Sequence, residues 1–193
     1  MANSSAGNCA DYGTQIDDGY NLTDDATCSF LTSPTDSTNT PAGLDPSRLK
    51  DNGGPTKTIA LLSTSPAVDA IPVANCTDVN GHAITTDQRG FLRPQGPGCD
   101  IGAYEYATAT SAVQSLINYV ESLGLAMGAE QSLSASLYAA LDSLNRGDNG
   151  TADNQLNAFL NKVSSDEQNG RLTAQQAAQL VAQVQLILKV LVA

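Results

Sequence analysis

Every proline and every cysteine of this chain precedes residue 108. The chain has 193 residues, and its eight prolines and four cysteines all lie within residues 1–107. The two parts also differ in charge, because most acidic residues precede residue 108. Such a change in composition predicts two domains, residues 1–107 and residues 108–193, with the small residues ATATSA at 107–112 as the linker.

Residues 108–193 contain segments in which apolar side chains recur at helical spacing. The hydroxyl of Thr173 can cap the last of them while Gln176, three residues later, reaches back to the cap. These features predict short amphipathic helices joined by tight turns, and therefore an antiparallel four-helix bundle. The apolar segments are 113–123, 133–144, 156–163 and 173–191, and Gly124, Gly147 with Gly150, and Gly170 separate them as helix stops.

Residues 1–107 show no helical period. Their short apolar pieces, at 58–62, 67–71 and 101–104, are separated by the turn-forming sequences DNGG, STSP and QGPG. This pattern predicts brief strands between turns. The strands are too few to close a sandwich, whereas a solenoid needs only short strands that each coil buries against the next.

The cysteines predict disulfide bonds. Cys9, Cys28, Cys76 and Cys99 form no CxxC pair, and the chain has one histidine, so the usual zinc arrangements are absent. Four cysteines allow three connectivities, and proximity favours Cys9 with Cys28 and Cys76 with Cys99, each closing a loop of about 20 residues worth about 3 kcal/mol. Disulfides indicate an oxidising compartment. The alternative is four buried free thiols in a cytosolic protein.

Charge and hydropathy exclude several classes of partner. Nine basic against twenty acidic residues give a formal net charge of −11, which repels nucleic acids and anionic membranes. The most apolar stretch, residues 180–193, is interrupted by Gln183, Gln185 and Lys189, so it predicts a core helix and not a membrane span. The first residues, MANSSAGNCADY, lack the basic and apolar regions of a signal peptide. We expect the chain to be the tail of a longer secreted or cell-surface protein.

Three stretches of the first part follow one another in a recognisable order. They are DDGYNLTDDATCSF at 17–30, DNGGPTKTIALLSTSPAVDA at 51–70 and TDQRGFLRPQGPGCDIGAYEY at 86–106. In this order they resemble the C-terminal coils of bacterial right-handed parallel β-helix proteins, of the choice-of-anchor Q or polymorphic outer-membrane-protein-like type. The resemblance covers about residues 8–106. It implies that residues 1–107 are the irregular, loop-rich all-β closing coils of a β-helix that is truncated at its N-terminal end.

The helical part carries a second resemblance. ALDSLNRGDNGTADNQLNAFLNKVSSDEQNGRLTAQQAAQLVAQVQLIL, residues 140–188, is similar to the small helical module called FIMAH, which follows such β-helices. The similarity lies in a helix that ends in Leu-Asn-Arg-Gly, then N.L.AF...V, then G.LT..QA..L. It implies an appendage on an extracellular protein, with no catalytic residues that can be carried over.

The third of these stretches, residues 86–106, is called here the closing motif. Its charged residues permit two interpretations. Glycoside hydrolysis needs two carboxyls about 5 to 9 Å apart, and β-helix lyases use an arginine or lysine base beside Ca²⁺. Alternatively, the arginines form bidentate pairs with the carboxylates and pin an irregular coil. We favour the structural role, because the coil stack that would carry a substrate groove is missing. The motif residues are Asp87, Arg89, Gly90, Arg93, Pro94, Asp100, Gly102 and Glu105.

Other polar residues give weaker signals. The aspartates Asp17, Asp18, Asp24 and Asp25, and the sequence DVNGH at 78–82, lack the twelve-residue loop with a terminal glutamate, so we expect turn-forming acids and no cofactor, with adventitious Ca²⁺ as the alternative. His82 has no nucleophile partner and is expected at the surface. Tyr104 and Tyr106 either stack on a sugar or cover the domain junction.

Together these features predict a non-catalytic fragment of an exported bacterial cell-surface or secreted β-helix protein with a structural, adhesion or attachment role. Its expected partners are a cell-surface or matrix polysaccharide or another surface protein. One alternative is a fragment of a carbohydrate-active β-helix enzyme, either a polysaccharide lyase or a glycoside hydrolase. A third hypothesis is an interaction module whose helical bundle pairs with a partner protein.

Overall fold

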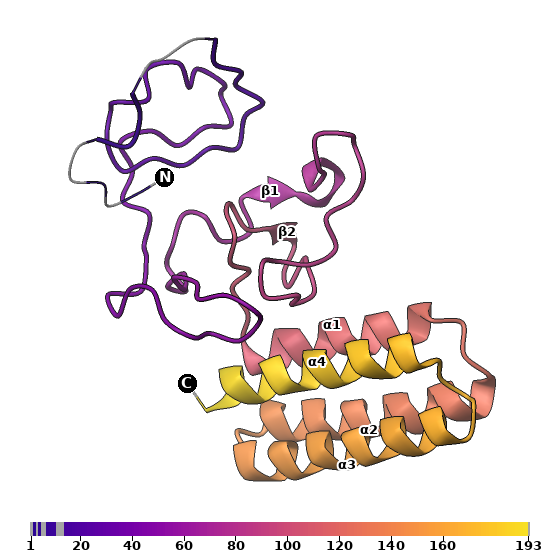
Figure 1. Ribbon diagram of the computed structural model, residues 1–193. Coiled ribbons are helices and arrows are strands. Elements are labelled where there is room, and N and C mark those ends of the chain that lie inside the picture. The colour runs from indigo at the N-terminus through magenta and orange to yellow at the C-terminus, as the bar shows by residue number, and fades with distance from the viewer. Residues whose placement is uncertain (1, 3, 5–6, 11–13, 193) are drawn as a thin grey trace.

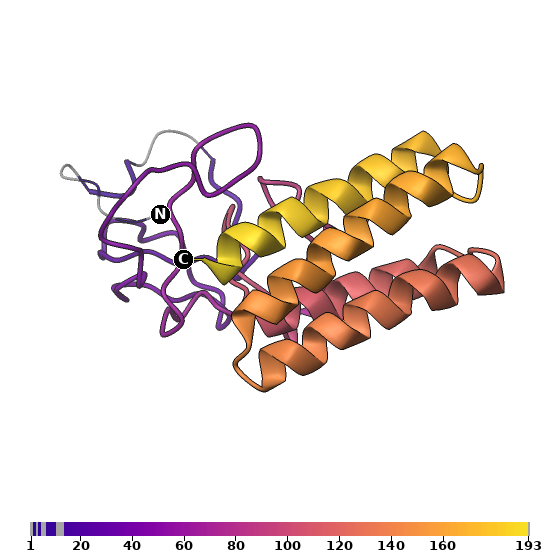
Figure 2. The ribbon, with the colours of Figure 1, turned by 90° about the horizontal axis from the view of Figure 1, so that it is seen from below.

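The computed structural model describes residues 2, 4, 7–10 and 14–192. The protein has two visibly different regions, a loop-rich part and a bundle of four helices (Figure 1). Seen from below, the loop-rich part lies against one end of the bundle, near the start of the first helix and the end of the last (Figure 2). Helical structure begins at Ala109, close to the predicted change at residue 108.

The four helices confirm the predicted antiparallel bundle. Each helix packs on its sequence neighbour, and the last helix also packs on the first. The side chains with full burial come from all four helices and include Leu116, Leu137, Phe159 and Leu180. Burial of the apolar face of each helix provides the main stabilisation of short helices. The helices are α1 (Ala109–Ser122), α2 (Met127–Asn145), α3 (Asn149–Gln168) and α4 (Ala174–Leu191).

Local sequence sets the helix ends. The Thr173 hydroxyl accepts a hydrogen bond from the Gln176 backbone N–H, and the Gln176 side chain accepts one from the Thr173 N–H, so the predicted capping box at α4 is confirmed. Gly170 follows α3 with φ +68°, a conformation that glycine adopts without strain. Gly150 was expected to stop a helix, but it lies in the first turn of α3 after the cap Asp148.

The loop-rich part contains little regular structure. In its described residues one sheet pairs β1 (Ile71–Pro72) with β2 (Gly98–Cys99) in antiparallel orientation, and a 3₁₀ turn, Val73–Asn75, follows β1. Further pairings are isolated bridges, of which one, between Leu22 and Ser37, is parallel. The described residues therefore form no coils of a right-handed parallel β-helix, and that expectation for residues 1–107 is corrected.

Side-chain hydrogen bonds explain why strands do not form here. The Asp17 carboxylate accepts hydrogen bonds from the backbone N–H groups of Thr32 and Ser33, at 2.8 and 2.9 Å. Asp, Ser and Thr side chains that bond backbone groups in this way compete with strand ladders. In the predicted piece 67–71, side chains likewise accept the N–H groups of Ala67 and Asp69, and only Ile71 enters a strand. The piece 58–62 contributes two bridge residues, and 101–104 contributes neither bridge nor strand.

Two disulfide bonds fasten this part. Cys9 is bonded to Cys28 and Cys76 to Cys99, which is the connectivity that proximity in the chain favours. Cys28, Cys76 and Cys99 are buried, so the bonds replace part of a core that this loop-rich part builds from few apolar residues. Such bonds stabilise mainly by restricting the unfolded chain. They fit a protein that folds in an oxidising compartment.

Among the described residues, no helix is both long enough and apolar enough to cross a membrane.

Candidate functional site

Asp87 and Arg89 form a buried pair at the centre of the closing motif. Arg89 donates from Nε to Asp87 Oδ2 at 2.8 Å, and its terminal nitrogen lies 2.7 Å from the same oxygen. Asp87 also accepts hydrogen bonds from the backbone N–H groups of Arg89, Phe91 and Glu105. The Asp87 side chain has no exposed surface and that of Arg89 is 2% exposed. Both charged groups are therefore used within the protein.

A second pair joins Arg93 to Glu105. Arg93 Nε lies 2.9 Å from Glu105 Oε2 and forms an ion pair with it, although the Nε–H group does not point at that oxygen. A terminal nitrogen of the same guanidinium donates a hydrogen bond to the Gly102 carbonyl at 3.1 Å. The two Glu105 oxygens accept the backbone N–H groups of Gln95 and Asp100. The Glu105 side chain is fully buried. This pair holds the two ends of the closing motif together.

Asp100 extends the network to the segment before β1. It accepts the Asp69 N–H at 2.7 Å through one oxygen and the Tyr106 N–H through the other. The Asp69 carboxylate in turn accepts the N–H of Gly98. The acids of SPAVDA and CDIGAYE thus fix backbone N–H groups.

Burial perturbs the carboxyl groups of this network. Desolvation, together with the smaller effect of the nearby Asp100 charge, raises the pKa of Glu105 to about 7. These effects outweigh the backbone hydrogen bonds from Asp100 and Gln95 and the attraction of Arg93, all of which lower it. Desolvation also raises the pKa of Asp100. At the surface the sign is opposite, because hydrogen bonds from Thr27 lower the pKa of Asp25.

We expect the free energy of unfolding to fall as the pH rises through about 4.5 to 7, because in that window folded Glu105 binds a proton that the unfolded chain releases. Below the ordinary aspartate pKa of 3.8, protonation of Asp25 and similar turn acids should also destabilise the fold. Thermal unfolding followed by circular dichroism at about pH 5 and about pH 8 tests this sign. The variant Glu105→Gln should flatten the difference, and equal melting temperatures of the wild type at the two pH values would contradict the expectation.

The closing motif also anchors the helical bundle. Gln183 of α4, 1% exposed, accepts the Leu92 N–H at 3.0 Å and donates to the Gly90 carbonyl at 2.6 Å. Between these two contacts Phe91, 1% exposed, inserts its ring into the core of the bundle. On the α1 side, the Ser115 hydroxyl donates to the Pro94 carbonyl at 3.4 Å. The motif therefore joins two parts of the chain that differ in structure.

The sequence NGG at 52–54 approaches the same junction. A Cβ on Gly53 would lie 2.2 Å from a Leu186 methyl group of α4, and one on Gly54 would lie 2.5 Å from the Arg89 Cα. Both glycines also have positive φ angles, +96° and +78°. Glycine at these two positions allows the loop to contact both the helix and the Arg89 backbone.

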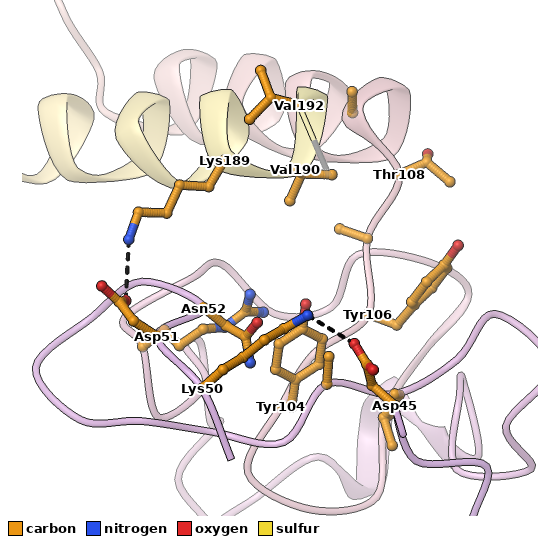
Figure 3. Close-up of a pocket in the computed structure, with 15 residues that line it drawn as sticks. Asp45, Lys50, Asp51, Asn52, Tyr104, Tyr106, Thr108, Lys189, Val190 and Val192 are labelled. Carbon is orange, nitrogen blue, oxygen red and sulfur yellow. Dashed lines mark hydrogen bonds and ion pairs between the residues drawn. The ribbon is translucent and has the colours of Figure 1, made fainter. Parts of the chain in front are cut away.

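Figure 3 shows a groove at this junction, with α4 on one side and the loop-rich part on the other. Its volume is about 610 Å³. Within the loop-rich part, Lys50 pairs with Asp45 at 2.9 Å. Lys189 of α4 pairs with Asp51 at 3.1 Å, and this ion pair joins the two parts. The remaining lining includes Asn52, Tyr104, Tyr106, Thr108, Val190 and Val192.

The other candidates lie outside this site. Asp17 and Asp25 accept hydrogen bonds from backbone N–H groups in turns. Asp24 accepts one from the Asn8 side chain, whereas Asp18 is exposed. Within the described ranges no three His, Cys, Asp or Glu side chains are grouped closely enough to hold a metal ion. His82 is exposed, as predicted, and contacts Asp78 at 3.3 Å.

Sequence reasoning did not find the anchoring role of Phe91 and Gln183. Gln183 carried a usable signal, because it lies at helical spacing on the same face as Leu180 and Ile187, and a buried amide requires hydrogen-bond partners. Phe91 carried none, since a single phenylalanine in a loop does not indicate which core it enters.

These observations define a class of protein: a disulfide-fastened loop region, ordered by a buried charge network, that is joined through Phe91 and Gln183 to an antiparallel four-helix module. The helical part matches the family model of the FIMAH domain over residues 110–189, so the similarity predicted from its sequence is confirmed. No match supports a choice-of-anchor Q or β-helix assignment for the loop-rich part. The chain matched none of the curated proteins and none of the solved structures with which it was compared.

Proposed function

We propose that this chain is a non-catalytic part of an exported bacterial protein and that it serves in attachment at the cell surface. The FIMAH domain suggests a surface-associated or adhesion-associated protein. The two disulfides support export to an oxidising compartment. The partner would be a polysaccharide of the cell surface or matrix, or another surface protein.

The observation that carries the proposal is the burial of the charged motif. Asp87, Asp100 and Glu105 are at most 8% exposed, and each accepts hydrogen bonds from backbone N–H groups. A catalytic acid or base must come within hydrogen-bond distance of the substrate atom that exchanges its proton. A polysaccharide chain has no access to these carboxyls in the folded protein. Their hydrogen bonds support a structural role, which is to order the motif whose Phe91 joins the loop-rich part to the bundle.

A cell-binding assay tests attachment. The fluorescently labelled chain should bind intact bacteria or their matrix and remain bound after washing. Periodate oxidation of the cells should abolish binding if the partner is a polysaccharide, whereas protease treatment should abolish it if the partner is a protein. Absence of binding to every cell and matrix preparation would contradict the proposed role.

A cleavage assay tests the enzymatic alternative. The chain should release no reducing ends and no unsaturated products from pectin, alginate or neutral glucans. Because removal of a buried charge can unfold the protein, the control variants are Arg89→Lys and Arg93→Lys, checked by circular dichroism. Cleavage by the wild type that is lost in either folded variant would overturn the non-catalytic assignment.

A further inference from the structure

The groove between α4 and the loop-rich part has the size and the lining of a ligand site. Its volume of about 610 Å³ lies within the range of about 300–1,000 Å³ that is usual for small-molecule sites. Its walls come from both parts of the chain, so a ligand would contact both (Figure 3). Apolar contributions come from Ala107, Ala109, Val190 and Val192.

Two tyrosines supply aromatic surface. The Arg89 guanidinium lies 3.7 Å from the Tyr104 ring centroid, and the buried pair with Asp87 holds that guanidinium in place. Tyr104 is therefore backed by a fixed group, which reduces the entropy lost on binding. Tyr106 follows on the same strand of chain, and its backbone N–H is bound by Asp100. In the described part of the chain neither tyrosine hydroxyl has a hydrogen-bond partner, so both can serve a ligand.

The charged side chains that line the groove are all paired, and Arg89 pairs with Asp87 behind the lining. The Lys50–Asp45 and Lys189–Asp51 pairs place ammonium donors beside carboxylate acceptors. Such neighbouring donors and acceptors suit hydroxyl groups, which both donate and accept. They offer no excess positive charge to an anion, and the formal net charge of −11 repels polyanions at long range. The lining therefore favours an uncharged, hydroxyl-rich ligand.

We propose that this groove binds a segment of an uncharged polysaccharide. Tyr106 and Tyr104 contact the C–H faces of sugar rings, and the two lysine–aspartate pairs and Asn52 bind the sugar hydroxyls. This inference rests on the proposed attachment function and names the ligand class. Because α4 and the loop-rich part both line the groove, the ligand is held at the junction that Gln183 and Phe91 stabilise.

Titration of the full chain with neutral hexasaccharides of glucose, mannose and N-acetylglucosamine tests the proposal. Binding can be followed by calorimetry or by tyrosine emission, since the chain contains six tyrosines and no tryptophan. At least one hexasaccharide should bind, and an anionic oligogalacturonate should bind about tenfold more weakly or not at all.

The variants Tyr106→Leu and Lys50→Met should each weaken hexasaccharide binding by about tenfold. Their matched controls, Tyr138→Leu on α2 and Lys162→Met on α3, lie outside the groove and should bind like the wild type. Failure of all the neutral hexasaccharides to bind, or wild-type binding by both groove variants, would overturn the proposal. If cell attachment persists in that case, the groove assignment fails while the attachment function stands.

Discussion

Replacing Phe91 with alanine should lower the free energy of unfolding by about 3–5 kcal/mol, because the ring is fully buried in the core of the bundle and its removal leaves a cavity there. The loss should reach both parts of the chain, since the same loop bonds to Gln183 and carries Asp87. Urea unfolding followed by helical circular dichroism measures the change directly, and tyrosine emission of a Tyr119→Phe, Tyr138→Phe background reports on the loop-rich part, which holds the other four tyrosines.

Phe30→Ala is the matched control. Phe30 is only partly buried and belongs to neither hydrophobic core cluster, so its replacement should cost clearly less. In the wild type the two signals should change at the same urea concentration. If Phe91→Ala unfolds like Phe30→Ala, or if the helical signal is unaffected, the bundle does not depend on the loop.

Removal of the Arg89 guanidinium should be comparably damaging. Arg89→Ala leaves the Asp87 carboxylate fully buried without its counter-ion, and such a change typically costs about 3–5 kcal/mol. It also removes the donor to the Glu105 carbonyl and the group that stacks on Tyr104. Chemical denaturation at neutral pH is the measurement.

Two further variants separate burial from charge. Asp87→Asn combined with Arg89→Met removes both charges and keeps side-chain volume, so this double variant should be more stable than Arg89→Ala. Arg171→Ala breaks the ion pair with Asp166, in which the Arg171 side chain is 60% exposed. Because water screens this pair, the free energy of unfolding should change by only about 0–1 kcal/mol. A similar cost for Arg171→Ala and Arg89→Ala would show that burial is not the cause.

The helical bundle could be predicted because its determinants are local. The apolar positions of each helix, the Thr173–Gln176 cap and the glycine after α3 all lie within a few residues of the structure that they set. Among the glycines, the prediction of a helix stop is wrong for Gly150, which lies in the first turn of α3. Gly150 closely follows Gly147, so the two glycines resemble one helix stop.

The loop-rich part could not be predicted in the same way. Its conformation depends on contacts such as Asp69 with Asp100 and Gln88 with Thr56, which join residues 31 and 32 positions apart. Residue types indicated that the arginines and acids would pair. They did not indicate that Asp87 would also accept hydrogen bonds from three backbone N–H groups. Short apolar pieces between turns predicted strands, whereas side-chain hydrogen bonds to the backbone took their place.

The position of Phe91 determines where the bundle can be separated from the rest of this chain. The four helices do not complete their own interior, since the loop that precedes them contributes an aromatic ring to it. A gene fragment cut at the first helix would encode a bundle with an unfilled hollow. Transfer of these helices to another protein would therefore preserve their stability only if the recipient supplied an equivalent ring, so the stable unit of this chain is longer than its helices.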